Sequence, residues 1–144
     1  MRVLVADDVA LMLSAVTALL RESCDVVGAV TNGRSALKKT LELQPDVVVL
    51  DVSMPGMSGI EVAIELKRQG SSAKVVFLTS HEDPEVQEIC ATAGGLGYVL
   101  KDSLGTDLVP ALSETHAGRR FASVAYPHKR NDQVKECRKE TVSG

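Results

Sequence analysis

The chain has 144 residues, of which 44% are hydrophobic, which is enough for one globular domain with a single core. Its formal net charge of -3 argues against a general nucleic-acid or membrane-surface binder, because both functions favour an excess of Lys and Arg. The first apolar stretch ends at Asp7, too early for a signal peptide or a membrane span. Cys24, Cys90 and Cys137 form no CxxC pair, which indicates a reduced, cytoplasmic protein.

Five short apolar segments predict β-strands. They are rich in β-branched residues and lack polar alternation, which is typical of strands buried on both faces of a parallel sheet. In chain order they cover residues 3–6, 26–30, 47–50, 75–78 and 98–100.

Apolar residues at helical spacing predict a helix after each of these strands. The first two helices follow Asp8 and the Asn32-Gly33 turn, and the third contains Ile60 and Leu66. The fourth begins near Pro84, a residue tolerated in the first helical turn. We expect its Val86, Ile89 and Cys90 to share one stripe, and a fifth helix to run from near Leu104 to Gly118 at the latest.

Strict alternation of strand and helix predicts an α/β fold. Specifically, we expect a flavodoxin-like, doubly wound (βα)5 parallel sheet with strand order 2-1-3-4-5 and helices on both faces. In such sheets, sites form beyond the carboxyl ends of the strands, near the point where the strand order reverses.

Charged and hydroxyl side chains follow the carboxyl ends of four predicted strands. They are Asp7 and Asp8 after the first, Asp51 after the third, Thr79 after the fourth and Lys101 after the fifth. At an effective dielectric of about 20, two carboxylates roughly 4 Å apart repel by about 4 kcal/mol, so three together require a cation or raised pKa values. Mg²⁺ fits a shallow acidic cleft, because it binds a few carboxylates together with waters and phosphate oxygens.

The same residues suggest phosphoryl chemistry. An ionised Asp51 can attack phosphorus in line and form an acyl phosphate, while Lys101 and the Thr79 hydroxyl hold the phosphoryl oxygens. Taken singly, each residue also has an ordinary explanation: a strand-end aspartate is often a helix N-cap, and Asp8 could cap the first helix. Random capping would not place the whole set at one edge.

Over residues 1–122 the chain resembles the response-regulator receiver family, the CheY-like domains of two-component systems. Four ordered motifs carry the resemblance: VLVADD at 3–8, PDVVVLDVSMPGMSG at 45–59, VFLTS at 76–80 and GYVLK at 97–101. Asp102 follows Lys101 where many members have proline, as in NarL/FixJ-type receivers.

The resemblance implies a role for each acidic residue. Asp51 would be the phosphoacceptor. Asp8, Asp51 and the backbone carbonyl of Ser53 would bind Mg²⁺ directly, and Asp7 would bind it directly or through a water. Met54 and Met57 are expected to pack in the loop, because thioethers are poor ligands for Mg²⁺.

The resemblance also implies a switch. Thr79 and Lys101 would contact the phosphoryl group, and Thr79 and Tyr98 would couple it to a conformational change. On sequence grounds alone, Tyr98 fits equally well as a residue that packs on the fourth helix. His81 lies where a side chain can influence access of hydrolytic water, although an exposed loop histidine is the simpler reading.

Residues 123–144 predict a polar tail in place of the helix-turn-helix domain that usually follows NarL-type receivers. Only Val134 and Cys137 are apolar between Pro127 and Thr141, too little to bury a second core, although residues 131–140 fit one short helix. We therefore expect a stand-alone receiver without an output domain.

The leading hypothesis is a phosphorylation switch. A histidine kinase or phosphotransfer protein would phosphorylate Asp51, and the face of the fourth helix, fifth strand and fifth helix would then change its affinity for a downstream protein or for a second copy in a homodimer. The domain would assist its own phosphorylation and dephosphorylation without being an enzyme.

One alternative is a phosphorylation-independent interaction or dimerisation module. Another is a Mg²⁺-dependent phosphohydrolase of the haloacid-dehalogenase type, which is disfavoured because Ser53 stands in place of its second acid.

Overall fold

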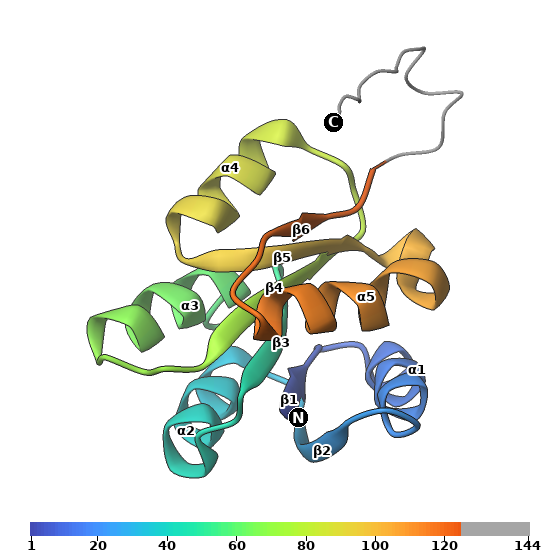
Figure 1. Cartoon of the computed structure of the whole chain (residues 1–144). Helices are drawn as coiled ribbons and strands as arrows, with labels where there is room; N and C mark the ends of the chain where they lie inside the picture. Colours follow the sequence, from blue (N-terminus) through green and yellow to red (C-terminus); the bar gives the residue numbers. More distant parts are fainter. Residues whose placement is uncertain (125–144) are drawn as a thin grey trace.

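The computed structural model describes residues 1–124. Within these residues a parallel sheet is covered by helices on both faces (Figure 1). Most of the predicted tail, including its helix at 131–140, lies outside the described residues. The strands are β1 (Arg2–Ala6), β2 (Asp25–Val30), β3 (Val47–Asp51), β4 (Lys74–Thr79), β5 (Gly95–Leu100) and β6 (Phe121–Ala122). The helices are α1 (Ala10–Leu20), α2 (Gly33–Leu43), α3 (Gly59–Arg68), α4 (Pro84–Thr92), the 3-10 helix η1 (Lys101–Ser103) and α5 (Leu104–His116).

The strand order is β2-β1-β3-β4-β5-β6, and all neighbouring strands are parallel. The predicted α/β class and the order of the first five strands are confirmed. The sixth strand was not predicted: Phe121 and Ala122 pair with Gly97 and Tyr98 at the edge of the sheet. A strand of two residues has no measurable apolar period, so the sequence contains no signal for it.

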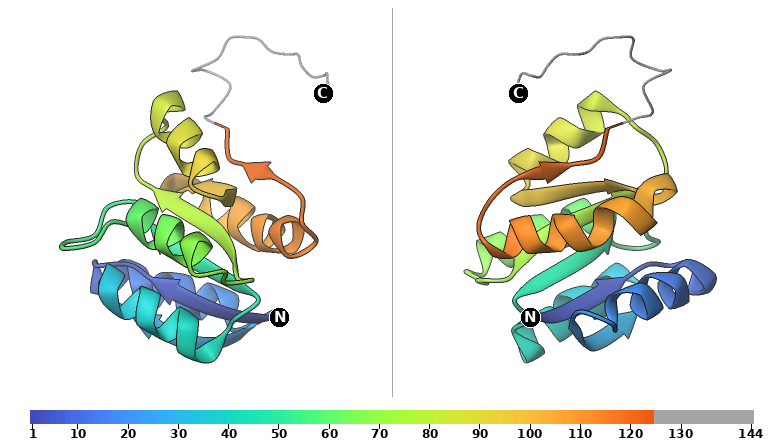
Figure 2. Two further views of the ribbon diagram at one scale, coloured as in Figure 1. Left: turned by 90° about the vertical axis from the view of Figure 1, so that its left-hand side faces the viewer. Right: turned by 45° about the vertical axis from the view of Figure 1, so that its right-hand side comes forward.

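Alternate residues along each strand supply two separate cores. One core lies between the sheet and the helices α1 and α5, and the other lies between the sheet and α2, α3 and α4, as the two views of Figure 2 show. Val3 and Val5 contribute to the first core, whereas Leu4 and Ala6 contribute to the second. This alternation explains why β1 and β3 are apolar at nearly every position.

Two details of the predicted burial are wrong. Strand β2 was expected to be buried on both faces, yet it is partly exposed along its length, because it is an edge strand that neighbouring elements cover incompletely. Ile89 was expected to share the buried stripe of α4, but 51% of it is exposed. Val86 and Cys90, four residues apart, face the core, and a helical step of about 100° per residue turns Ile89 away from Cys90.

Most element boundaries follow recognisable signals. Asn32 caps α2, Ser58 and Glu61 form a capping box at the start of α3, and Asp83 caps α4 just before Pro84. Strand β5 begins at Gly95, three residues before the predicted start. The sequence did not indicate this earlier start, because Gly95 and Gly97 interrupt the apolar pattern. Among residues 1–124, every helix is too short or too polar to cross a membrane.

Candidate phosphoryl-acceptor site

Three carboxylates meet at the carboxyl edge of the sheet. Asp7 and Asp8 follow β1 and Asp51 ends β3, and these two strands are paired, with Ala6 beside Leu50. One carboxylate oxygen from each aspartate lies within 4.8 Å of the other two. Asp7 and Asp51 are buried, and Asp8 is exposed. The three acids therefore form one cluster with a single side open to solvent.

Lys101 reaches this cluster from the end of β5. Its Nζ atom lies 3.0 Å from Oδ2 of Asp7 and 3.1 Å from Oδ2 of Asp51. The Lys101 side chain is 11% exposed, so its ion pairs are screened less than those of a surface lysine. One ammonium group balances only one of the three acids, so the cluster keeps a negative charge when all of them are ionised.

The surroundings of Asp51 disfavour its ionised form. Burial and then the charge of Asp7 raise its pKa from 3.8 to about 6, although the charge and hydrogen bond of Lys101 act in the opposite direction. Burial acts to lower the pKa of Lys101, but the close contact with the Asp7 carboxylate and the charge of Asp51 raise it. A bound cation would therefore stabilise the ionised form of the three acids.

The donor atoms of the cluster fit Mg²⁺. The Oδ2 atom of Asp7 is buried and accepts no geometrically sound hydrogen bond within residues 1–124, even though the Lys101 ammonium lies 3.0 Å away. Its Oδ1 atom accepts a hydrogen bond from the Val9 amide at 2.9 Å, which fixes the carboxylate in place. Carboxylate oxygens, one of them buried and without a hydrogen bond, are suitable ligands for a hard divalent cation.

Ser53 lies in the loop next to these acids. Its backbone amide donates a hydrogen bond to Oδ1 of Asp51 at 3.3 Å, and the residue itself is exposed. Asp8 and Ser53 both line an open hollow of about 380 Å³ together with Val52, Met54, Pro55 and Ser58. The metal-binding role of the Ser53 carbonyl stays a prediction. Met54 is buried in the core and Met57 packs against it, so the expectation that both methionines pack is confirmed.

Close packing of the loop after Asp51 positions it against α3. The amide of Gly59 donates a hydrogen bond to the Val52 carbonyl, and the amide of Val52 donates one to the Leu78 carbonyl. A Cβ atom on Gly59 would lie 2.1 Å from the carbonyl oxygen of Asp51. Only glycine allows α3 to begin this close to the end of β3.

The two residues predicted to form the switch share a hydrogen-bond acceptor. Thr79 ends β4, and its hydroxyl donates to the carbonyl of His81 at 3.3 Å. The Tyr98 hydroxyl donates to the same carbonyl, also at 3.3 Å. Both residues are buried, and burial raises the pKa of Tyr98. The contact uses the backbone of His81, whose side chain is exposed, so no side-chain pattern could have indicated it.

Asp8 does not cap helix α1, although the sequence made it a candidate for that role. The N-cap residue is Val9, which has no capping side chain, and it is Asp7 that accepts the hydrogen bond from the Val9 amide. Lys101 and Asp102 lie in the 3-10 helix η1, which leads directly into α5. The predicted start of α5 at Leu104 is confirmed.

Fold and site together define a doubly wound α/β protein with one acidic cluster, paired with a lysine, at the ends of its strands. Residues 3–113 match the model of the response regulator receiver domain, and the chain belongs to this family.

Similar proteins include a transcriptional regulatory protein and response regulators. The chain is 39% identical over 124 residues to the uncharacterized transcriptional regulatory protein YvfU of Bacillus subtilis, covering 85% of this chain and 62% of YvfU. It is 38% identical over 124 residues to the response regulator GacA of Pseudomonas viridiflava, covering 85% of this chain and 58% of GacA. The chain thus spans about three fifths of the length of these relatives.

Among solved structures, the signal receiver domain of the putative response regulator NarL from Mycobacterium tuberculosis is similar to this chain, with a TM-score of 0.79 and 34% identity. That comparison covers 82% of this chain and 97% of the NarL domain. The isolated receiver domain of RcsB from Salmonella enterica, solved with the phosphomimetic BeF3-, has a TM-score of 0.78 and 28% identity and covers 85% of this chain and 93% of that chain.

Proposed function

We propose that this domain accepts a phosphoryl group on Asp51 from a histidine kinase or a phosphotransfer protein, in a reaction that requires Mg²⁺. The observation that carries the proposal is the position of the buried Asp51 carboxylate, 3.1 Å from Lys101 and clustered with Asp7 and Asp8. Membership of a family of signalling domains supports it.

Each site residue has a defined part in this reaction. A carboxylate oxygen of Asp51 forms a bond to phosphorus while the bond from phosphorus to the donor nitrogen breaks, and the donor keeps that electron pair and takes up a proton. Lys101 stabilises negative charge on the phosphoryl oxygens. Asp7, Asp8, Asp51 and the Ser53 carbonyl would hold Mg²⁺, which would offset charge between the acids and the incoming group.

The contact between Thr79, Tyr98 and His81 supports a switch. A phosphoryl group on Asp51 is a stronger acceptor for the Thr79 hydroxyl than the backbone carbonyl of His81. If the Thr79 hydroxyl turns toward the phosphoryl group, Tyr98 alone donates to the His81 carbonyl. The packing of side chains beneath α4 and β5 then changes. We propose that the face of α4, β5 and α5 then binds a downstream protein or a second copy of the domain.

The remaining expectations belong to this proposal as predictions. They are the cytoplasmic location and the ability of the domain to assist its own phosphorylation and dephosphorylation. The alternative of a haloacid-dehalogenase-type phosphohydrolase has no support at Ser53, which carries no carboxylate.

Beryllofluoride, a phosphoryl mimic, tests the switch directly. We expect sedimentation and pull-down profiles to change when the protein receives beryllofluoride with Mg²⁺, and the Asp51→Asn variant to show no change. Identical profiles for treated and untreated wild-type protein would favour the phosphorylation-independent module. Turnover of small phosphate esters well beyond one equivalent per chain would favour the phosphohydrolase.

A further inference from the structure

Ser123 forms a buried hydrogen-bonded bridge beside the fifth strand. Only 4% of its surface is exposed. Its Oγ atom accepts a hydrogen bond from the backbone amide of Leu100 at 3.1 Å and donates one to Oδ2 of Asp107 at 2.6 Å. The Ser123 amide also donates to the carbonyl of Tyr98 at 2.8 Å. Three hydrogen bonds thus bind this residue to β5 and α5.

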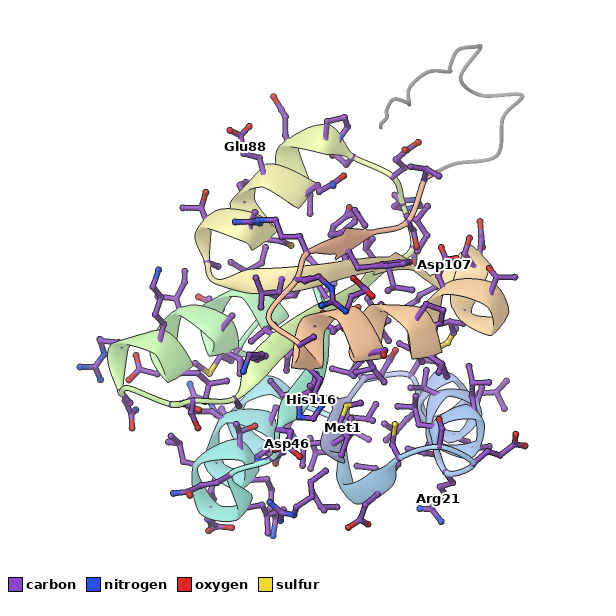
Figure 3. The ribbon with its side chains drawn as sticks, in the orientation of Figure 1. Met1, Arg21, Asp46, Glu88, Asp107 and His116 are labelled. Carbon is purple, nitrogen blue, oxygen red and sulfur yellow. The ribbon has the colours of Figure 1, made fainter. Side chains whose placement is uncertain are left out.

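The two side-chain contacts flank the segment that carries Lys101. Leu100 is the last residue of β5 and directly precedes Lys101, and Asp107 lies in the first turn of α5. Figure 3 labels Asp107 at the start of α5 beside the end of β5. Asp107 is held in turn by the Thr106 hydroxyl, which lies 3.1 Å from its Oδ1 atom. Ser123 therefore links the last residue of β5 to the first turn of α5, on either side of the η1 segment that starts with Lys101.

The residue type suits this position. Strand β6 ends at Ala122, so it does not extend alongside Leu100, and the Ser123 side chain takes the place of a strand partner for the Leu100 amide. A buried amide without an acceptor is costly. A hydroxyl accepts and donates at once, so one short side chain serves both Leu100 and Asp107.

We propose that Ser123 is a positioning residue for Lys101: it fixes the turn from β5 into η1 so that the ammonium group stays between Asp7 and Asp51. The proposal rests on the proposed phosphorylation of Asp51. The three acids follow β1 or end β3, and Ser123 contacts neither strand in any hydrogen bond found among the described residues. Loss of the Ser123 bridge should therefore slow phosphoryl transfer without weakening Mg²⁺ binding.

The test compares Ser123→Ala, which removes both side-chain bonds, with Ser123→Thr, which can keep them. Ser113→Ala, at an exposed serine of α5, is the matched control. Rates of phosphorylation by acetyl phosphate are followed by intact mass, and Mg²⁺ affinity by NMR titration. We expect Ser123→Ala to react at least about fivefold more slowly, because one lost hydrogen bond corresponds to a factor of about five and this variant loses two. Ser123→Thr should recover most of the rate, and no variant should bind Mg²⁺ more weakly than wild type.

Other outcomes have distinct meanings. A folded Ser123→Ala protein that reacts at the wild-type rate overturns the positioning role, as does a rate loss matched by an equal loss of Mg²⁺ affinity. If Ser123→Ala does not fold, Asp107→Asn weakens one bond of the bridge and should slow the reaction about twofold; a wild-type rate in that variant overturns the proposal. If wild-type protein is never phosphorylated, the proposed function itself fails, which is a different result.

Discussion

The ammonium nitrogen of Lys101 lies 3.1 Å from Oδ2 of Asp51, and it shares its charge with Asp7 at 3.0 Å. A single cation is therefore divided between two buried acids, while Asp8 lies at the solvent-exposed side of the same cluster. This arrangement leaves Asp51 less acidic than an ordinary aspartate and makes the site sensitive to any change in local charge.

Replacement of Lys101 by methionine separates metal binding from phosphoryl transfer. The change removes a cation that competes with Mg²⁺, so we expect the Mg²⁺ affinity to rise several-fold. Phosphorylation by acetyl phosphate should slow by about tenfold or more, because no ammonium stabilises the phosphoryl oxygens. NMR titration and intact mass measure the two effects. Lys67→Met, at an exposed lysine of α3, should change neither, and weaker Mg²⁺ binding in Lys101→Met would contradict the charge argument.

Asp51→Asn should stabilise the metal-free protein at neutral pH. The folded-state pKa of about 6 lies above the ordinary 3.8, so the folded chain holds the Asp51 proton more tightly than the unfolded chain. The stability that this proton contributes is fully present below about pH 4, falls as pH rises toward 6 and is lost above it.

Urea unfolding at pH 5 and pH 7 in EDTA measures this effect. At pH 7 we expect Asp51→Asn to exceed wild type by about 1 to 3 kcal/mol, with a smaller pH dependence. Asp25→Asn, at an exposed aspartate on β2, serves as the control. An Asp51→Asn protein less stable than wild type at pH 7 would show that the Lys101 ion pair outweighs burial and repulsion.

Asp8→Ala should abolish stabilisation by Mg²⁺ with little effect on the metal-free protein. Asp8 is exposed, so its loss removes little packing, but it is one of the three clustered acids. A ligand present at 100 times its dissociation constant stabilises the folded state by about 2.7 kcal/mol. Thermal melts with and without Mg²⁺ should show a shift for wild type and almost none for Asp8→Ala. An equal shift in both proteins would exclude Asp8 as a ligand.

Two glycine substitutions test the packing behind Asp51. Gly59→Ala places a Cβ atom 2.1 Å from the Asp51 carbonyl oxygen, so we expect a loss of about 1 to 3 kcal/mol in unfolding free energy and slower phosphorylation. Gly105, in α5, has open space around a new Cβ atom. Gly105→Ala should therefore stabilise the domain by up to about 1 kcal/mol. Equal effects of the two changes in urea unfolding would contradict the close approach at Gly59.

The apolar segments of the sequence predicted the fold well because the central strands of the parallel sheet are buried on both faces. Strand β3 shows this best, since all five of its residues are buried. The edges of the sheet were harder: β2 is apolar but partly exposed, and β6 is too short for a period. Whether a strand lies at an edge depends on the order of the strands, which the local pattern does not contain.

The acidic residues could be located in advance because each directly follows or ends a strand, and parallel strands end at one edge. Contacts that involve backbone groups could not be predicted from the sequence. The His81 carbonyl joins Thr79 to Tyr98 without using the His81 side chain. Ser123 follows a segment with no clear sequence pattern. Its structural role becomes visible only in its hydrogen bonds with Leu100 and Asp107.

Phosphorylation at Asp51 is tested most directly by incubation of the protein with acetyl phosphate and Mg²⁺, followed by intact mass measurement and peptide mapping. We predict the addition of one phosphoryl group per chain, on the peptide that contains Asp51, and its loss in EDTA and in Asp51→Asn. A protein that never gains this mass, or that gains it equally as Asp51→Asn, would contradict the proposed function.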